Sequence, residues 1–447
     1  GIGPAIGVSA PLTELNAQAQ GKPRAARRSP PAMRAEAAKR PPDWTVTLVL
    51  LSMGLVPFYG GGALAIFLVA VIALAVWRVQ AGTCTGEPMA WMPLAAVSLY
   101  LVYFWLTEMV HGGSLAPPSG ILLQSAPLLV AALMIPVLRR APALAPARVG
   151  HWARVSALVT ALIGVAIGIF APPSVLPVTA PVYVWGDTLR LEMFSKNPVI
   201  FSICLSFLVV LGFLAVRSGT ARAGVTAVLA FGLSLGVIAV LSQSRGPTAV
   251  LVLAAIVLLF VLRPKATAIL ALVVAALASV GGMVLVFDQF RPEMGGVVEY
   301  ITLGGAELFR APQSAESSFD QRKLMYEAAF EAWRAAPLFG HGYDRQFIAI
   351  IPYLDLPMLV PSVDPTTPLQ FKDPHQALLN HMVAGGLVGL AIFLFVAFVP
   401  PIMLWMSGDK RPEARFFAWT ITLVLLGSGM TTSVMGHFVH ATSLGTL

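Results

Sequence analysis

The chain has 447 residues, of which 57% are hydrophobic and 11% are charged, and its mean hydropathy is +0.80. Soluble domains carry roughly 25% charged residues, so a soluble globular protein and a disordered chain are excluded; the two cysteines, Cys84 and Cys204, make neither a disulfide framework nor a zinc cluster. A net charge of +8 would suggest nucleic acid as the partner of a soluble protein. In so apolar a chain the basic residues are better explained as topology signals, and no nucleic-acid partner is expected.

The first 43 residues are rich in Ala, Pro and Arg. Such a composition offers too little apolar surface to bury, and no apolar core follows closely enough for a cleavable signal peptide. We therefore predict that residues 1–43 form a disordered, basic cytosolic tail.

The rest of the chain is dominated by apolar runs, many of them close to the roughly 20 residues that cross a bilayer as a helix. The runs are 44–59, 61–78, 89–110, 121–138, 152–171, 197–216, 223–242, 247–262, 266–287, 376–406 and 416–434. They predict an all-α polytopic membrane protein with 11–12 transmembrane helices. We divide it into transmembrane helices 1–9 at 44–287, one long loop containing helices at 288–375, and C-terminal transmembrane helices at 376–447.

The distribution of basic residues orients these spans. If the chain starts inside, 19 of its 29 Lys and Arg residues fall in the tail and the cytosolic turns. The short outer loops then hold only Arg190, Lys196 and Arg245, and the remaining basic residues lie in the long segment 288–375. Long loops follow the positive-inside rule poorly. The pattern predicts that the long segment lies outside, which is the periplasm in a Gram-negative cell.

The long segment contains one clear helix pattern, Ser317–Ala336. A serine can cap its start, Asp320 favours its positive N-terminus, and Pro337 follows its end. An apolar face at helical spacing comprises Met325, Ala329, Ala332, Trp333 and Ala336. Arg322 falls on this same face, so we expect it to need an anionic partner.

Arg245 interrupts two uncharged runs, in the sequence Ser242-Gln243-Ser244-Arg245-Gly246. The break places its guanidinium at the outer membrane–water boundary, where charge is costly. One interpretation is an arginine whose charge merely reaches the interface. The other is a phosphate ligand, because a guanidinium is planar, permanently charged and able to donate in a fork.

His375 stands where the long loop enters the run 376–406, in Asp373-Pro374-His375-Gln376. A single histidine is often only a satisfied polar residue. Beside bound phosphate, however, a neutral imidazole can accept a proton near neutral pH. Asp373 is positioned to orient the ring, although Pro374 separates the two side chains in the sequence.

Other polar residues are open to two interpretations. Arg190 and Lys196 can attract an anionic head group or serve as simple loop charges. His341 lies in a glycine turn, which favours a structural role. His381 can face a cavity or pack in the interior, and Glu108 and His111 form a further polar pair.

Several catalytic signatures are absent from the sequence: the phosphate-binding loop of nucleotide hydrolases, the His-Glu-x-x-His zinc motif and the serine hydrolase elbow. No metal and no cofactor are expected. The remaining candidates are arginines and a histidine at the outer lipid surface. This set suits a lipid diphosphate leaving group, whose charge arginines stabilise while histidine deprotonates an acceptor hydroxyl.

At these residues the chain resembles the O-antigen ligase and polymerase superfamily of bacterial membrane glycosyltransferases. The matching elements are Ser244-Arg245-Gly246, Arg322-Lys323-Leu324-Met325 leading into Pro337-Leu338-Phe339-Gly340-His341-Gly342, and Pro374-His375-Gln376 followed by Gly385-Gly386-Leu387-Val388-Gly389-Leu390. A pattern reported for the ligase branch is His followed by Asn, Ser or Gln, then nine residues, Gly, two residues, and Gly, Thr or Tyr. His375, Gln376, Gly386 and Gly389 satisfy it.

The resemblance implies a fold like that of the C-type glycosyltransferases and a metal-independent transfer of glycan from an undecaprenyl-diphosphate-linked donor at the periplasmic face of the bacterial inner membrane. It implies His375 as the catalytic base and Arg245 and Arg322 as diphosphate ligands. Arg190 has no firm counterpart in the family and is a third candidate ligand from its place in an outer loop; Asp373, His341 and Gln376 are candidate supporting residues. The family usually has about twelve spans, one more than the apolar runs counted above.

The favoured function is therefore an O-antigen ligase, whose acceptor is a lipid A-core sugar. A polysaccharide polymerase of the same fold, with another lipid-linked glycan as acceptor, is the closest alternative. A protein O-glycosyltransferase or an anionic-lipid transporter fits less well, because transporters place charges near the bilayer midplane and often contain repeats, and neither feature is seen in the sequence.

Overall fold

The computed structural model describes residues 43–55, 88–112, 146–170, 182–185, 188–191, 198–213, 221–262, 264–290, 318–354 and 376–429, with isolated residues between 66 and 77 and between 128 and 133. The chain divides into two units, 1–40 and 41–447, and all described residues belong to the second. The predicted tail lies outside the described residues, apart from its last position.

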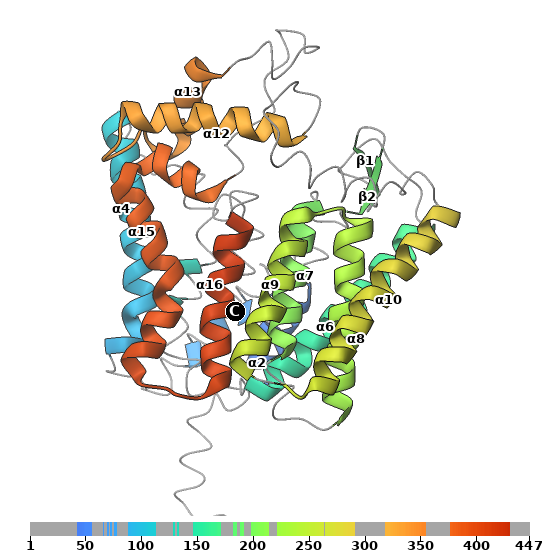
Figure 1. The fold of residues 1–447 in the computed structure, drawn as a ribbon. Helices are drawn as coiled ribbons and strands as arrows, with labels where there is room; N and C mark the ends of the chain where they lie inside the picture. Colours follow the sequence, from blue (N-terminus) through green and yellow to red (C-terminus); the bar gives the residue numbers. More distant parts are fainter. Residues whose placement is uncertain are drawn as a thin grey trace, which may run out of the picture. The chain divides into compact units, whose positions relative to one another are not determined.

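Helices account for nearly all of the described chain (Figure 1). The α-helices are α2 (Asp43–Leu55), α4 (Met92–Gly112), α6 (Pro146–Phe170), α7 (Pro198–Gly212), α8 (Ala221–Gly236), α9 (Arg245–Leu262), α10 (Ala266–Phe290), α12 (Ser318–Ala335), α13 (Gln346–Ile350), α15 (Ala377–Ser407) and α16 (Pro412–Gly429). Four short helices join them: η1 (Pro88–Trp91), the π-helix η4 (Val237–Leu241), η6 (Tyr343–Arg345) and η7 (Ile351–Tyr353). A small antiparallel hairpin pairs β1 (Val182–Trp185) with β2 (Thr188–Leu191).

Five of the described helical stretches are long and apolar enough to cross a membrane: Met89–Gly112, Ala147–Phe170, Ala223–Leu241, Ala266–Phe287 and Ala377–Ser407. Pro198–Gly212 and Arg245–Val261 are shorter apolar helices. The all-α polytopic fold class is thus confirmed. The exact number of spans stays a prediction, because most of the runs 61–78 and 121–138 lies outside the described residues.

The main core lies between α6, α7, α8, α9, α10 and α16, which pack on one another through Leu, Val, Ile, Phe and Ala side chains. Gly232 and Gly236 of α8 face Ala275 and Met283 of α10, so the two helices run close together and in the same direction. Between membrane helices such close backbone approach replaces the hydrophobic effect as the source of attraction. A second, aromatic cluster joins α4 to α15.

Tryptophans mark the helix ends that the predicted topology places on the cytosolic side. Trp44, Trp91 and Trp405 lie in the first or last turn of a helical segment, and Trp405 is 82% exposed. Such aromatic side chains favour the level of the lipid head groups. Arg154, one of the 19 basic residues counted above in the tail and the cytosolic turns, instead lies inside α6; it is buried and its Nη1 donates to the Ala223 carbonyl at the start of α8 (3.1 Å).

Candidate functional site

Helix α12 begins and ends within one residue of the predicted helix Ser317–Ala336. It buries Met325, Ala329 and Ala332, together with Ala328, against α15 and the short helices that follow it. In Figure 1, α12 lies across the end of the bundle that also carries the β-hairpin.

Arg322, one turn before Met325, is half-buried on α12. Burial raises the pKa of the neighbouring Tyr326 phenol, and the positive charge of Arg322 acts in the opposite direction. Within the described part of the chain Arg322 makes no hydrogen bond or ion pair, so the anionic partner expected from its position is not found among these residues.

The segment 337–342, which we call the motif loop, binds the backbone of α15 where that helix is broken at Gly386 (φ 64°, ψ −160°). Four backbone hydrogen bonds join them: His341 N to Val383 O (2.9 Å), Gly342 N to Ala384 O (2.9 Å), Leu387 N to Pro337 O (2.8 Å) and Val388 N to Leu338 O (3.3 Å). The loop thus satisfies the donors and acceptors that the break removes from the helical ladder. Two of the sequence motifs form one backbone-to-backbone unit.

Only glycine fits the closest points of this unit. A Cβ on Gly386 would lie 2.2 Å from the Leu338 carbonyl carbon, and one on Gly340 would lie 2.5 Å from the Ala384 backbone. Both glycines also have positive φ angles, 64° and 69°, which L side chains rarely adopt. The glycines of the two motifs are therefore required by backbone contact.

The predicted supporting residues His341 and Gln376 both contact backbone groups. His341 Nε2 donates to the Ala332 carbonyl in the last turn of α12 (2.7 Å). The Gln376 side chain accepts from Leu379 N and caps the start of α15. These contacts give each side chain a structural role; a role in catalysis stays a prediction.

Arg245 is the first residue of α9 and is half-buried, directly after a distorted stretch of chain. Helix α8 continues into the π-helix η4, and Ser242 N donates to Val237 O five residues back (2.9 Å). Gln243 then has a φ of 50°, the only positive φ of a residue other than glycine in the described chain. π-Helices and strained residues concentrate at functional sites.

Buried serines hold this break in place. Ser242 Oγ donates to the Pro198 carbonyl at the start of α7 (2.8 Å) and lies 2.7 Å from Ser202 Oγ and 2.9 Å from Ser244 Oγ. Ser244 O accepts from Thr248 N (3.1 Å) and thereby starts α9. Arg245 consequently projects from a fixed helix N-terminus, a place that favours bound anions.

Arg190 lies in β2, opposite Tyr183 of β1, and is half-buried. The next residue, Leu191, is fully buried and lies with Val237 of η4 against Gly164 of α6. The strand that carries Arg190 therefore packs beside the π-helix that leads to Arg245. Both β2 and α9, which carry Arg190 and Arg245, contact η4; a joint role of the two arginines at a diphosphate stays a prediction.

His375 and Asp373 lie outside the described residues. The helix that follows His375 is fixed by His381, for which the sequence allowed either a cavity-facing or a packed position. The His381 side chain is fully buried and stacks on the Phe393 ring (4.1 Å between ring centroids). Its Nδ1 donates to the Ala377 carbonyl (2.6 Å), so its Nε2 accepts from the Tyr100 hydroxyl of α4 (2.9 Å). Tyr100 was not identified from the sequence, because 281 residues separate it from its partner.

Glu108 and His111, expected as a polar pair, have separate partners. Glu108 forms an ion pair with Arg345 of η6 (3.5 Å), and His111 Nδ1 donates to the Thr107 carbonyl (2.8 Å). No group of three His, Cys, Asp or Glu able to hold a metal occurs among the residues that the structure describes.

The fold and these positions define a polytopic helical membrane protein with half-buried arginines on the elements at one end of its bundle. Residues 227–394 match the family model described as O-antigen ligase. Over this segment the match confirms the resemblance to the O-antigen ligase-like superfamily, whose members are glycosyltransferase-like enzymes. The match includes Arg245, Arg322 and His375, whereas no curated protein matches the chain.

Proposed function

We propose that the protein is an O-antigen ligase of the bacterial inner membrane, which transfers a glycan from undecaprenyl diphosphate to a lipid A-core sugar on the periplasmic side. The observation that supports this most strongly is the backbone ladder between the motif loop and α15. It joins the helix that carries Arg322 to the helix that follows His375 in the sequence, so backbone hydrogen bonds hold the two motif-bearing helices together.

In the proposed reaction an acceptor hydroxyl oxygen attacks the anomeric carbon of the donor glycan. His375 takes the hydroxyl proton, and the bond between the anomeric carbon and the diphosphate oxygen breaks. The leaving group is undecaprenyl diphosphate, whose negative charge Arg245 and Arg322 stabilise, with Arg190 as a third ligand. Pre-positioned donors aimed at developing charge commonly contribute the largest part of such catalysis.

The base assignment is tested by His375→Ala in a strain that lacks the native gene. We expect glycan transfer to fall by roughly a hundredfold or more, because general-base catalysis typically contributes that much, while protein level and donor binding stay unchanged. The measurement is the lipid that carries the glycan, separated by extraction and gel. The control is His111→Ala, an exposed histidine at the outer end of α4.

The same strains separate ligase from polymerase. Loss of a ligase leaves long polymer on the undecaprenyl carrier, whereas loss of a polymerase leaves single repeat units there. Single repeats in the His375→Ala strain would replace the proposed function with polymerisation. Full transfer activity in that variant would refute the role of His375.

A further inference from the structure

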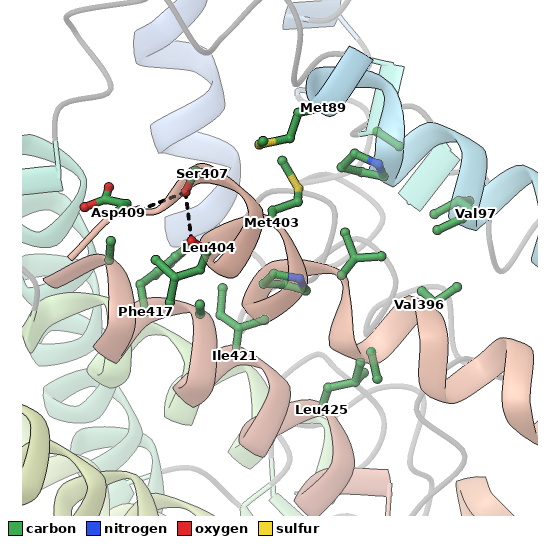
Figure 2. A pocket seen from close by; sticks show the side chains of 18 of the residues that line it. Met89, Val97, Val396, Met403, Leu404, Ser407, Asp409, Phe417, Ile421 and Leu425 are labelled. Atoms are coloured by element: carbon green, nitrogen blue, oxygen red, sulfur yellow. Dashed lines mark hydrogen bonds between the residues drawn. The ribbon is translucent and has the colours of Figure 1, made fainter. Parts of the chain in front are cut away.

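A second site lies at the other end of α15, between α4, α15 and α16. It is a pocket of about 480 Å³ that begins at the turn joining α15 to α16 and extends along α15 as far as Val396. Figure 2 shows Met89, Met403, Leu404 and Ile421 around it, from three different parts of the chain. Pro400, which also lines the pocket, removes a hydrogen bond of α15 there.

The pocket is apolar inside and polar only at its mouth. Its described lining consists of aliphatic, Met, Pro and Phe side chains, apart from Ser407, Asp409 and Arg411 at the turn. An apolar cavity gives water too few hydrogen-bond partners to hold it. Its volume falls in the range of pockets that bind small apolar ligands, roughly 300–1,000 Å³.

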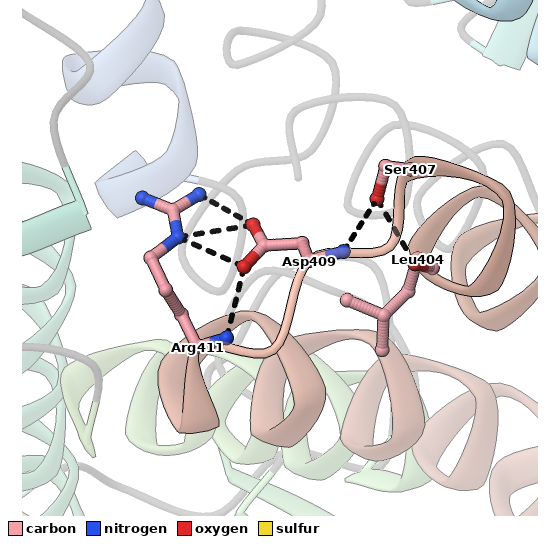
Figure 3. Close-up of polar contacts among 4 residues, drawn as sticks. All are labelled: Leu404, Ser407, Asp409 and Arg411. Atoms are coloured by element: carbon pink, nitrogen blue, oxygen red, sulfur yellow. Dashed lines mark hydrogen bonds and ion pairs between the residues drawn. The ribbon is translucent and has the colours of Figure 1, made fainter.

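The mouth of the pocket is positively charged, and two nitrogens of the Arg411 guanidinium are already held by Asp409. Asp409 accepts two bonds from Arg411 Nε (3.1 and 3.0 Å) and one from Nη2 (2.7 Å), as Figure 3 shows. Arg411 Nη1 takes part in none of these bonds, and Arg411 is 72% exposed. Lys410 is exposed on the same turn and Arg415 in the first turn of α16, where Glu413 also acts on Arg411, so three cations stand against the two carboxylates of Asp409 and Glu413. The hydrogen bonds from Arg411, and less strongly the charge of Arg415, lower the pKa of the Asp409 carboxyl.

The exposed Trp405, beside the mouth, indicates that this turn lies at the level of the lipid head groups. We propose that the pocket binds one anionic phospholipid of the surrounding leaflet, with an acyl chain among the apolar side chains and the phosphate at Arg411, Lys410 and Arg415. The charge of the mouth complements a lipid phosphate, and basic sites at the cytoplasmic ends of membrane helices recognise such head groups. A lipid held here would tie α4 to α16 at the end opposite the glycosyltransferase site.

The test uses the purified full chain in mixed micelles and native mass spectrometry. Phosphatidylglycerol and phosphatidylethanolamine with identical acyl chains are titrated separately. The native protein is expected to retain one phosphatidylglycerol in preference to phosphatidylethanolamine. Ala414→Phe, which fills the pocket, is expected to weaken both lipids at least tenfold. Arg411→Gln is expected to abolish the preference for phosphatidylglycerol. Both lipids should then bind equally, because the acyl chain still fits among the apolar side chains.

Matched controls lie outside the pocket at exposed positions near helix starts. Ala266→Phe controls for added bulk and Arg148→Gln for lost charge, and both are expected to bind like the native protein. Equal retention of the two lipids by the native protein, or native binding by Ala414→Phe, would overturn the proposal. Displacement of phosphatidylglycerol by millimolar inorganic phosphate would show a bare anion site instead, with no acyl chain bound.

Discussion

At the scale of single residues, Arg322 and Arg334 provide a matched pair on one helix. Arg322 is half-buried on the packed side of α12, whereas Arg334 is exposed, pairs with Glu331 (3.0 Å) and lies over the Phe330 ring. An exposed ion pair of this kind contributes little, about 0–1 kcal/mol. Substitutions at these two positions therefore distinguish an arginine that binds the donor from an arginine that only lies on the surface.

We expect Arg322→Lys to lower the transfer rate by roughly tenfold or more, because lysine keeps the charge but cannot donate in a fork. Arg334→Lys should leave the rate unchanged. The measurement is initial rate against donor concentration in membranes, which shows whether donor binding or the chemical step has changed. If Arg322→Lys behaved like the native protein, charge alone would be sufficient at that position.

The glycines of the motif loop and of α15 allow a graded test of the backbone unit. Gly386→Ala should destabilise the protein by about 1–3 kcal/mol for its backbone conformation (φ 64°, ψ −160°), which is essentially confined to glycine, with a further loss from overlap with the Leu338 backbone. Gly408→Ala should show only the conformational part, since its φ is 62° but nothing lies within 4 Å of its added Cβ. Gly281→Ala on α10 should not destabilise the protein, because nothing lies within 4 Å of its added Cβ. Thermal unfolding in detergent ranks the stabilities of the three variants. Equal losses of stability in Gly386→Ala and Gly408→Ala would contradict the close contact between Gly386 and the Leu338 backbone.

Residue types at the site could be recognised from the sequence more readily than their partners. Arg245 stood out because charge is rare inside an apolar chain, and Gly386 because it belongs to a family pattern. The binding of the motif loop to α15 was not predictable, since backbone groups carry no signature of their partners. The contact between Tyr100 and His381 was missed for the related reason that it joins residues distant in the chain.

At the scale of elements, the break between α8 and α9 depends on buried hydroxyl groups. We predict that Ser242→Ala destabilises the protein by about 0.5–1.5 kcal/mol, because the buried hydroxyl that joins the Pro198 carbonyl to the Ser202 and Ser244 hydroxyls is lost, while each of these groups keeps one other hydrogen bond. It should also raise the donor concentration needed for half-maximal rate, by loosening the N-terminus that carries Arg245. The measurements are unfolding temperature and donor dependence of the rate. Ser407→Ala, on the exposed turn at the end of α15, is the control.

The helices themselves were the easiest elements to predict, because burial in lipid imposes a long apolar run. Helix α12 was found equally well from its polar cap and following proline. The π-helix η4 and the short β-hairpin escaped prediction. A π-helix differs from an α-helix by one residue in its hydrogen-bond spacing and leaves no separate hydropathy pattern.

At the scale of the whole molecule, the orientation in the membrane is the property on which the proposed site depends. We predict that Glu331→Cys, on the exposed face of α12, reacts with a membrane-impermeant maleimide in intact spheroplasts. Lys410→Cys, on the turn after α15, should react only after the membrane is permeabilised. Cys84 is first replaced by Ser, whereas the buried Cys204 can stay. Labelling of Lys410→Cys in intact spheroplasts would reverse the topology and exclude a periplasmic site for Arg245.

The π-helix before Arg245 also bears on how this chain tolerates changes in length. Because η4 accommodates one more residue per turn than an α-helix, deleting a single residue from Val237–Leu241 could convert it to regular helix while α8 keeps its neighbours. The same deletion would draw the chain after Leu241 back by one residue and remove the wide turn at which Ser242 N donates to Val237 O and Ser242 Oγ reaches the Pro198 carbonyl. We therefore expect such a deletion to leave the membrane bundle folded while the N-terminus that carries Arg245 loses its anchor, which would separate folding from enzymatic activity.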